Sequence, residues 1–338
     1  MYIVSFLVIL ICGVMTHNND QSAVMATSNY SIPIAGRYQW NENHGYCGEV
    51  SFISAGLHFG QYVSQYETRA LASPGVPQNK ASSQLLIGVN GAKAASAMRL
   101  NYEEWDTVAE NNTDYFLLWI KQHVAQGHPV VIGVYMNQYR FDGNTSPSAG
   151  DPQYDHIVPV IGTSTNHSVN SYHGSDTLTL SDNAEWERDD NPPYFFTYRF
   201  DEFQLSRKQA NAKNGPLYST ADNAENYGIA LTGVVDLKHE TLPVSVETNV
   251  NYERPEIKDG TSTRPAAMPL TLTITVHDVV PNVSYVLYKY TSFNDVPESD
   301  FNGNSGNAAS AIKFTIDSGS TYTTTDAIQS DELAIYRC

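Results

Sequence analysis

The segment Gly45–Gln65, GYCGEVSFISAGLHFGQYVSQ, decides how the chain folds around its first internal cysteine. Its apolar residues recur at three- and four-residue steps, which predicts a helix from Tyr46 to about Gln65. Cys47 falls in the first turn of this helix, where the helix dipole and unbonded backbone N–H groups stabilise a thiolate. Cys47 is therefore a candidate nucleophile, although an inert buried cysteine would fit the same position.

Two more helical patterns and then several β-branched runs follow this segment. The helical patterns cover residues 81–98 and 114–126. The expected strands are Val130–Tyr135, His156–Gly162, Thr177–Asp182, Phe195–Phe200 and Tyr227–Val235. Helices followed by antiparallel strands indicate an α+β fold, with N-terminal helices packed on an antiparallel sheet.

The chain changes character near residue 239, where short alternating runs are separated by Pro, Gly, Asn and Asp. The expected strands there are Leu242–Val250, Leu270–Val276, Ser284–Tyr290, Ala311–Ile316 and Glu332–Tyr336. This spacing predicts an all-β sandwich domain over residues 239–338. Its many tyrosines are suited to a carbohydrate or protein ligand, but aromatic residues are also common in any β-sandwich.

The N-terminus reads as a targeting segment. Residues 1–16, MYIVSFLVILICGVMT, predict a signal peptide, with an uncleaved anchor or buried helix as the alternative. Residues 17–36 are then a polar leader. Five Asn-X-Ser/Thr triplets, expected on the surface of a secreted glycoprotein, begin at Asn29, Asn111, Asn144, Asn166 and Asn282. A soluble extracellular chain without a membrane span is expected after cleavage.

Charge and cysteine count narrow the function further. The formal net charge of −17 argues against nucleic acid as a partner. Cys12 belongs to the expected signal peptide, so Cys47 and Cys338 remain, either as free thiols or paired with each other. Pairing would exclude a nucleophilic Cys47. No metal or other cofactor is expected, because His167 and His173 lack further residues at ligand spacing.

Two later segments supply what thiol chemistry needs, namely a base and a group that orients it. Asp155-His156 opens one expected strand, and Ser181-Asp182-Asn183 ends another. Neighbouring antiparallel strands of this length can bring His156 beside Asp182 or Asn183.

The order "Q…CGE", then "DHIVPVIG", then "LTLSDN" resembles the papain-like cysteine peptidases, most closely the C39-like branch, over residues 37–238. The resemblance implies that Cys47 is the nucleophile. It also implies that His156 is the general base, which later protonates the leaving group.

The resemblance leaves two candidates for the residue that orients the histidine and two for the side-chain oxyanion donor. Either Asp182 or Asn183 orients the histidine; alternation with the apolar residues of its strand favours Asp182, and Asn183 matches the family's asparagine. Gln39 is the implied oxyanion donor, although the family's usual spacing before the cysteine is shorter and falls on Asn41. The backbone N–H of Cys47 is the second donor.

These features predict a secreted thiol hydrolase that acts on peptide or isopeptide bonds of a protein or peptide substrate. A transpeptidase or ligase would use the same nucleophile with an amine in place of water. A non-enzymatic extracellular binding protein on the same scaffold is the alternative from another class. Unusual reactivity of Cys47 separates the enzymes from the binding protein.

Overall fold

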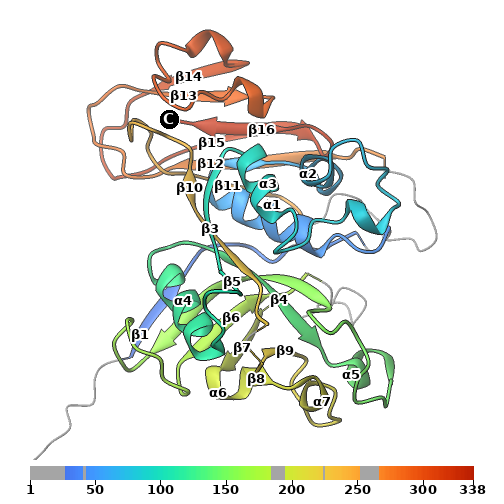
Figure 1. The fold of residues 1–338 in the computed structure, drawn as a ribbon. Coiled ribbons are helices and arrows are strands. Elements are labelled where there is room, and N and C mark those ends of the chain that lie inside the picture. Colours follow the sequence, from blue (N-terminus) through green and yellow to red (C-terminus); the bar gives the residue numbers. More distant parts are fainter. Residues whose placement is uncertain (1–26, 41–42, 184–194, 224, 252–265) are drawn as a thin grey trace, which may run out of the picture.

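The computed structural model describes residues 27–40, 43–183, 195–223, 225–251 and 266–338, which form a mixed helix and strand fold (Figure 1). The helices are α1 (Cys47–His58), α2 (Gln65–Ala72), α3 (Gly91–Ala97), α4 (Thr113–Ala125), α5 (Gln138–Asp142), α6 (Phe200–Phe203) and α7 (Arg207–Ala210). Short 3-10 turns lie at Ala81–Ser83, Phe293–Asp295 and Ser305–Asn307. None of the helices in the described ranges is long and apolar enough to cross a membrane.

The largest sheet has nine strands, of which six run side by side in the order β3-β10-β4-β5-β6-β7. Its strands are β1 (Ser28–Ser31), β3 (Leu100–Glu104), β4 (Val130–Met136), β5 (His156–Thr165), β6 (Thr177–Ser181), β7 (Phe195–Arg199), β8 (Gln204–Leu205), β9 (Tyr218–Ala221) and β10 (Gly228–Val234). Every pairing is antiparallel except that of β8 with β9.

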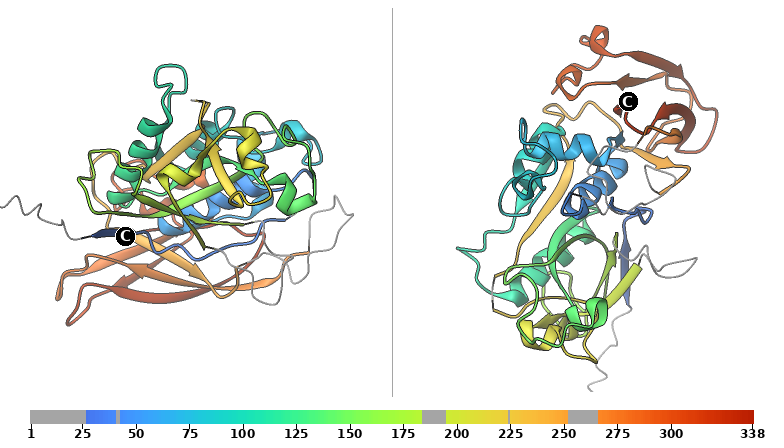
Figure 2. Two further views of the ribbon diagram at one scale, coloured as in Figure 1. Left: turned by 90° about the horizontal axis from the view of Figure 1, so that it is seen from below. Right: turned by 90° about the vertical axis from the view of Figure 1, so that its right-hand side faces the viewer.

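The central strands separate two hydrophobic cores, because successive residues of a strand point to opposite faces. Val131 of β4 and Ile157 of β5 pack in one core with α1 and α3. The next residues, Ile132 and Val158, pack in the other core with α4. The start of β5 therefore lies against α1. In Figure 1 and in the right-hand view of Figure 2, the blue helices lie between the large sheet and the C-terminal strands.

The leader expected over residues 17–36 joins the fold where it is described. Ser28–Ser31 form β1, which pairs with the second half of β5, so that Ser28 lies opposite Thr165. The side chains of Ile32 and Ile34 are buried in the α4 core. These residues thus add an edge strand and core contacts to the sheet.

Two predicted helices are shorter than expected, and glycine explains both. Helix α1 ends at His58, since Gly60 adopts a φ of +74° and a Cβ there would lie 2.9 Å from Val244. The expected helix over 81–98 is reduced to α3 and one 3-10 turn. Gly88 has a φ of +78°, and the ring of Tyr227 lies 2.8 Å from the position of a Cβ.

The C-terminal strands form two antiparallel sheets, with the orders β11-β12-β15 and β14-β13-β16-β2. Their bounds are β2 (Gln61–Tyr62), β11 (Val244–Thr248), β12 (Pro269–Val276), β13 (Tyr285–Tyr290), β14 (Ser310–Phe314), β15 (Tyr322–Gln329) and β16 (Ala334–Arg337). Strand β2 follows α1 directly and pairs with β16, so Ala334 lies opposite Tyr62. One core is common to these strands and α1–α3, where Leu57 and Tyr62 belong to the same cluster as Leu272 and Ile335.

Candidate active site

Cys47 and His156 meet because α1 packs across the start of β5. Cys47 is the first residue of α1, and His156 is the first residue of β5. The Cys47 thiol lies close enough to the His156 ring to contribute to the raised pKa of that histidine. The structure thus brings together a half-buried free thiol and a histidine that are more than a hundred residues apart in the sequence.

Asp182, just past the end of β6, holds the other side of the same ring. Its Oδ1 lies 3.2 Å from Nε2 of His156, and both side chains are buried. The ring also stacks on Tyr218 of β9, with 5.7 Å between centroids. The arrangement of thiol, imidazole and carboxylate is that of an activated nucleophile.

Electrostatics favour the charged form of the histidine. Burial of His156 opposes protonation, but hydrogen bonds and charge interactions with Asp182 and Cys47 outweigh it and raise the pKa to about 10 from the ordinary 6.5. The imidazolium is therefore the resting form at neutral pH.

This pKa predicts an NMR titration with a clear sign. Since its pKa is raised, the His156 ring should stay protonated through pH 8 and lose its proton only near pH 10. The ¹⁵N shifts of His156, assigned by comparison with His156→Gln, report the protonation state directly. A ring that titrates near pH 6.5, like an unperturbed histidine, would contradict the linked thiol and carboxylate.

Asn183 lies at the site but, among the described residues, forms no hydrogen bond with the histidine ring. Its Nδ2 donates to the carbonyl oxygens of Cys47 and Ile157, both at 3.2 Å, and lies 3.4 Å from Oγ of Ser51. These bonds fasten the first turn of α1 to β5. Of the two residues that the sequence left open, Asp182 contacts the imidazole and Asn183 positions the cysteine.

Removal of the Asn183 amide should cost stability. Asn183→Ala removes one donor from each of two carbonyl oxygens, which keep only the Ser51 hydroxyl as a side-chain donor, and we expect the free energy of unfolding to fall by about 1–2 kcal/mol. Urea unfolding followed by circular dichroism measures the change, with the exposed Asn170→Ala as control. A loss no larger than that of the control would mean that the amide does not hold α1 in place.

Gln39 lies against the residue that precedes the cysteine. Its Oε1 accepts a hydrogen bond of 3.0 Å from the backbone N–H of Tyr46, and its own N–H donates to the Asn183 carbonyl at 3.0 Å. Within the described ranges, the Gln39 Nε2 has no hydrogen-bond partner, and no side chain caps α1. The side-chain amide of Gln39 and the N–H of Cys47 are thus available as donors. Asn41, the alternative donor, lies outside the described residues.

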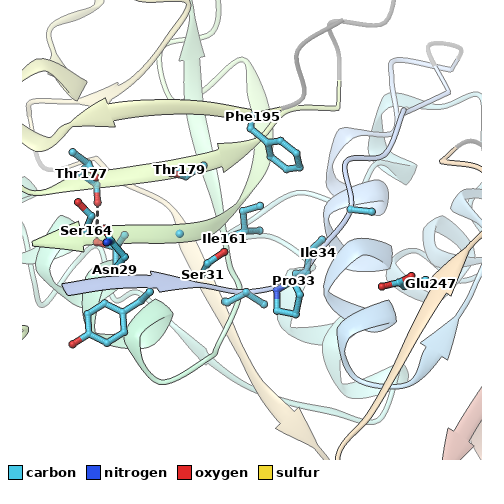
Figure 3. Close-up of a pocket in the computed structure, with 15 residues that line it drawn as sticks. Asn29, Ser31, Pro33, Ile34, Ile161, Ser164, Thr177, Thr179, Phe195 and Glu247 are labelled. Carbon is cyan, nitrogen blue, oxygen red and sulfur yellow. Dashed lines mark hydrogen bonds between the residues drawn. The ribbon is translucent and has the colours of Figure 1, made fainter. Parts of the chain in front are cut away.

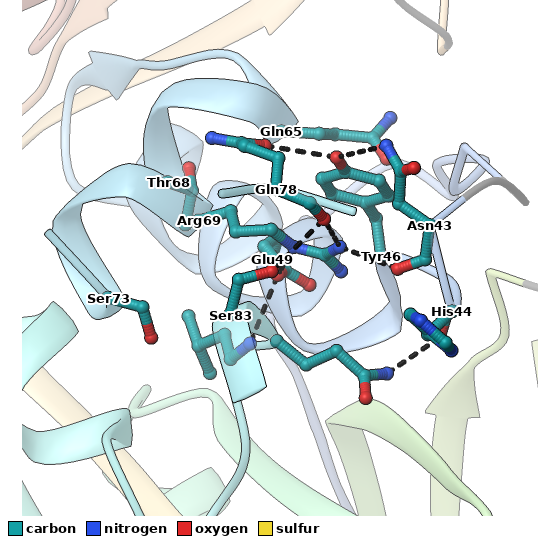
Figure 4. Close-up of polar contacts among 12 residues, drawn as sticks. Asn43, His44, Tyr46, Glu49, Gln65, Thr68, Arg69, Ser73, Gln78 and Ser83 are labelled. Carbon is teal, nitrogen blue, oxygen red and sulfur yellow. Dashed lines mark hydrogen bonds and ion pairs between the residues drawn. The ribbon is translucent and has the colours of Figure 1, made fainter. Parts of the chain in front are cut away.

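The loop before Cys47 is strained, and side chains that donate hydrogen bonds to its carbonyl groups hold it in place (Figure 4). Asn43, His44 and Gly45 have φ values of 52°, 70° and 81°, a left-handed conformation that is costly for residues other than glycine. The guanidinium of Arg69 donates to the carbonyls of Asn43, at 2.8 Å, and Gly45. Gln84 Nε2 donates to the His44 carbonyl at 2.6 Å. These bonds offset the strain of the loop.

The guanidinium of Arg69 is itself fixed by a buried carboxylate. Its Nε lies 2.5 Å from Oε1 of Glu49, and both side chains are almost fully buried. Arg69 also lies over the ring of Tyr46, 3.5 Å from its centroid. Burial raises the pKa of Glu49, against the lowering effect of Arg69. Sequence reasoning missed this pair; the only signal was a charged residue, Glu49, on an otherwise apolar helix.

Gly48 explains why glycine follows the cysteine. A Cβ at this position would lie 2.2 Å from the carbonyl oxygen of Leu85. The Leu85 N–H also donates to Oε1 of Glu49 at 3.0 Å. The close approach of this segment therefore depends on a residue without a side chain next to Cys47.

The second cysteine offers a contrast to the first. Cys47 and Cys338 are both free, so the alternative disulfide between them is not formed. Burial raises the pKa of the Cys338 thiol to about 12. Cys338 is therefore unreactive at neutral pH and serves as an internal reference for Cys47.

His167 and His173, whose sharing of a metal the sequence did not favour, stack on each other with 3.5 Å between ring centroids. His167 Nδ1 lies 3.4 Å from Oδ1 of Asp176, whose Oδ2 forms a buried ion pair with Lys121 at 2.6 Å. Across the part of the chain that the structure describes, no three His, Cys, Asp or Glu residues are grouped as metal ligands.

A separate open groove of about 540 Å³ lies on the sheet beside β1, β5 and β6 (Figure 3). It combines the side chains of Thr177 and Thr179 with those of Ile161 and Phe195. Glu247 is the one charged residue among the described residues that line it. No residue of the Cys47 site lines this groove.

No family model matches the chain, and no curated protein is significantly similar to it. The case for the site therefore rests on the geometry around Cys47, His156 and Asp182.

Proposed function

We propose that the protein is a secreted papain-like thiol hydrolase that cleaves peptide or isopeptide bonds, with a C-terminal β-sandwich. The observation that carries the proposal is the position of the His156 ring, which lies near the Cys47 thiol and within hydrogen-bond distance of Asp182. The α+β architecture, with a cysteine-bearing helix against an antiparallel sheet, supports the papain-like assignment.

The proposed reaction begins with the thiolate of Cys47. It attacks the carbonyl carbon of the scissile bond and forms a C–S bond, while the carbonyl π electrons move to the oxygen. When the tetrahedral intermediate collapses, the C–N bond breaks and the His156 imidazolium donates its proton to the leaving amine. Water then attacks the thioester, His156 accepts a proton from it, and the carboxylic acid leaves as the thiolate is restored.

We assign the oxyanion of both intermediates to two donors, the Nε2 of Gln39 and the backbone N–H of Cys47. The Gln39 side chain is held beside the cysteine by the hydrogen bond that its Oε1 accepts from the N–H of Tyr46. Loss of one such donor costs roughly 10²–10³ in rate in well-studied hydrolases. Asp182 keeps the ring aimed at the thiol, and Asn183 keeps the thiol aimed at the ring.

Secretion is part of the proposal and rests on the apolar first sixteen residues and on the five glycosylation triplets. All five asparagines, Asn29, Asn111, Asn144, Asn166 and Asn282, are exposed in the structure. They are thus accessible to a glycosyltransferase, as the proposal needs.

A library of internally quenched fluorescent peptides tests the function. We expect the wild-type protein and Cys338→Ser to cleave members of the library, and Cys47→Ala to cleave none. Trapping of a thioester on Cys47 by acid quench and mass spectrometry would identify the acyl-enzyme. If no peptide or isopeptide substrate is cleaved and no acyl-enzyme forms, the binding-protein alternative replaces the hydrolase.

A further inference from the structure

A second site lies at the opposite end of α1, where the helical part of the chain meets the C-terminal strands. A half-open cavity of about 520 Å³ lies there, bordered by the end of α1, β10, the segment before β11, and β16. Its volume falls within the range of small-molecule sites, roughly 300–1,000 Å³. A helix of twelve residues is about 18 Å long, which separates this cavity from the nucleophile at the other end.

The cavity is lined by a buried cation that forms no ion pair with any described residue. Arg337 is 2% exposed, and its Nη groups donate to the carbonyls of Phe59, at 3.1 Å, and Tyr336, at 2.8 Å, and to Oε1 of Gln61, at 3.1 Å. Its Nε is buried without a hydrogen-bond partner among the described residues. Burial lowers the pKa of Arg337 to about 10, yet the side chain stays charged at neutral pH.

Asp236 is the one carboxylate that lines this cavity in the described ranges, and it is already hydrogen-bonded to Thr241. Oδ2 of Asp236 accepts hydrogen bonds from the N–H and the hydroxyl of Thr241, both at 2.8 Å, and it forms no ion pair with Arg337. The charge of Asp236 acts on Arg337 and raises its pKa, but only from beyond ion-pair distance. A buried charge without an ion pair is costly, and an anion bound in contact with Arg337 would compensate it.

The other walls of the cavity indicate which chemical groups a bound anion must have besides its charge. Phe59, Leu242 and Val244 supply apolar surface, and the imidazoles of His58 and His277 lie among them. The Nδ1 of His58 is buried with no hydrogen-bond partner among the residues the structure describes. A free phosphate would leave the apolar walls uncovered, whereas an organic acid fits both kinds of surface.

We propose that this cavity binds a small organic carboxylate, with its anionic group toward Arg337 and its apolar body against Phe59, Leu242 and Val244. The proposal does not depend on the function of the Cys47 site. It assigns a ligand-binding role to the junction that the C-terminal strands make with the rest of the fold.

Calorimetric titration of the full mature protein tests the proposal with 4-phenylbutyrate and its neutral partner 4-phenylbutyramide, and with inorganic phosphate. We expect saturable binding of the carboxylate at one site per chain, and at least tenfold weaker binding of the amide and of phosphate. Asn101→Trp, which fills the cavity from an exposed lining position on β3, should abolish binding. Glu104→Trp, on the other face of the same strand, should not.

Arg337 is tested separately, because its replacement could unfold the protein. Arg337→Gln that retains the wild-type circular dichroism spectrum should bind the carboxylate at least tenfold more weakly, with recovery in Arg337→Lys. No saturable binding of the carboxylate up to millimolar concentration would overturn the proposal. So would equal affinity for acid and amide, or binding that survives Asn101→Trp.

Discussion

Replacing His156 by alanine is expected to lower kcat/KM for peptide cleavage by roughly 10⁶, the cost of removing the base of a nucleophile–base pair in a well-studied hydrolase. The reason is that the ring holds the proton that the leaving amine needs, and that it favours the thiolate of Cys47. The loss should appear in kcat as well as in kcat/KM, since the ring acts on the reacting atoms. Steady-state kinetics on the best peptide of the library measure both parameters.

His44→Ala is the matched control for this experiment. His44 lies three residues before Cys47 but is exposed. Its backbone carbonyl accepts a hydrogen bond from Gln84, and its ring forms none with the described residues. Its replacement should change kcat/KM by less than about threefold, because no step of the reaction uses its ring. Equal losses for His44→Ala and His156→Ala would mean that the assigned base is wrong.

Replacing Arg69 by methionine is expected to lower the free energy of unfolding by about 3–5 kcal/mol. The variant leaves the Glu49 carboxylate buried without its cation, and it removes the donors that hold the carbonyls of Asn43 and Gly45. The left-handed loop before Cys47 would then lack its support. Guanidinium unfolding monitored by fluorescence measures the loss.

Arg199→Met is the matched control, since it breaks an ion pair whose side chains are about half exposed, 49% for Arg199 and 46% for Asp201. Surface pairs of this kind contribute about 0–1 kcal/mol. The double variant Glu49→Leu/Arg69→Met should recover much of the stability, because it removes the unpaired charge. If Arg69→Met and Arg199→Met have similar effects, the buried pair does not support the loop.

Local patterns in the sequence predicted much of the fold. Helix α4 lies within one residue of its expected bounds, because an amphipathic pattern follows an Asn112 side chain whose Oδ1 accepts from the N–H of Asp114 at 2.8 Å. Strand β15 was missed, since YTTTDAIQ carries few apolar residues and half of its residues are exposed. The extent of α1 was overestimated because the close contact between Gly60 and Val244 depends on the tertiary fold.

The site was predictable to the degree that its residues lie on regular elements. Alternation along β6 favoured Asp182 over Asn183 as the residue facing His156, and the 3.2 Å contact agrees with that choice. The role of Arg69 was not predictable, because several of its partners are backbone carbonyls. Every residue has a backbone carbonyl, so these partners give no sequence signal. The pairing of β2 with β16 was also not predicted, since a two-residue strand has no detectable sequence pattern.

The most direct test of the central claim compares the two thiols of the same molecule. The mature protein and His156→Ala are treated with iodoacetamide from pH 4 to 9, and alkylation of Cys47 and Cys338 is followed by mass spectrometry. We predict that wild-type Cys47 reacts rapidly at pH 6, where a free thiol with a pKa of about 8.5 is protonated. Cys338, whose pKa burial raises to about 12, should react slowly at every pH, and His156→Ala should slow Cys47 at pH 6. Slow alkylation of Cys47 that rises only above pH 8 and ignores His156 would contradict the account.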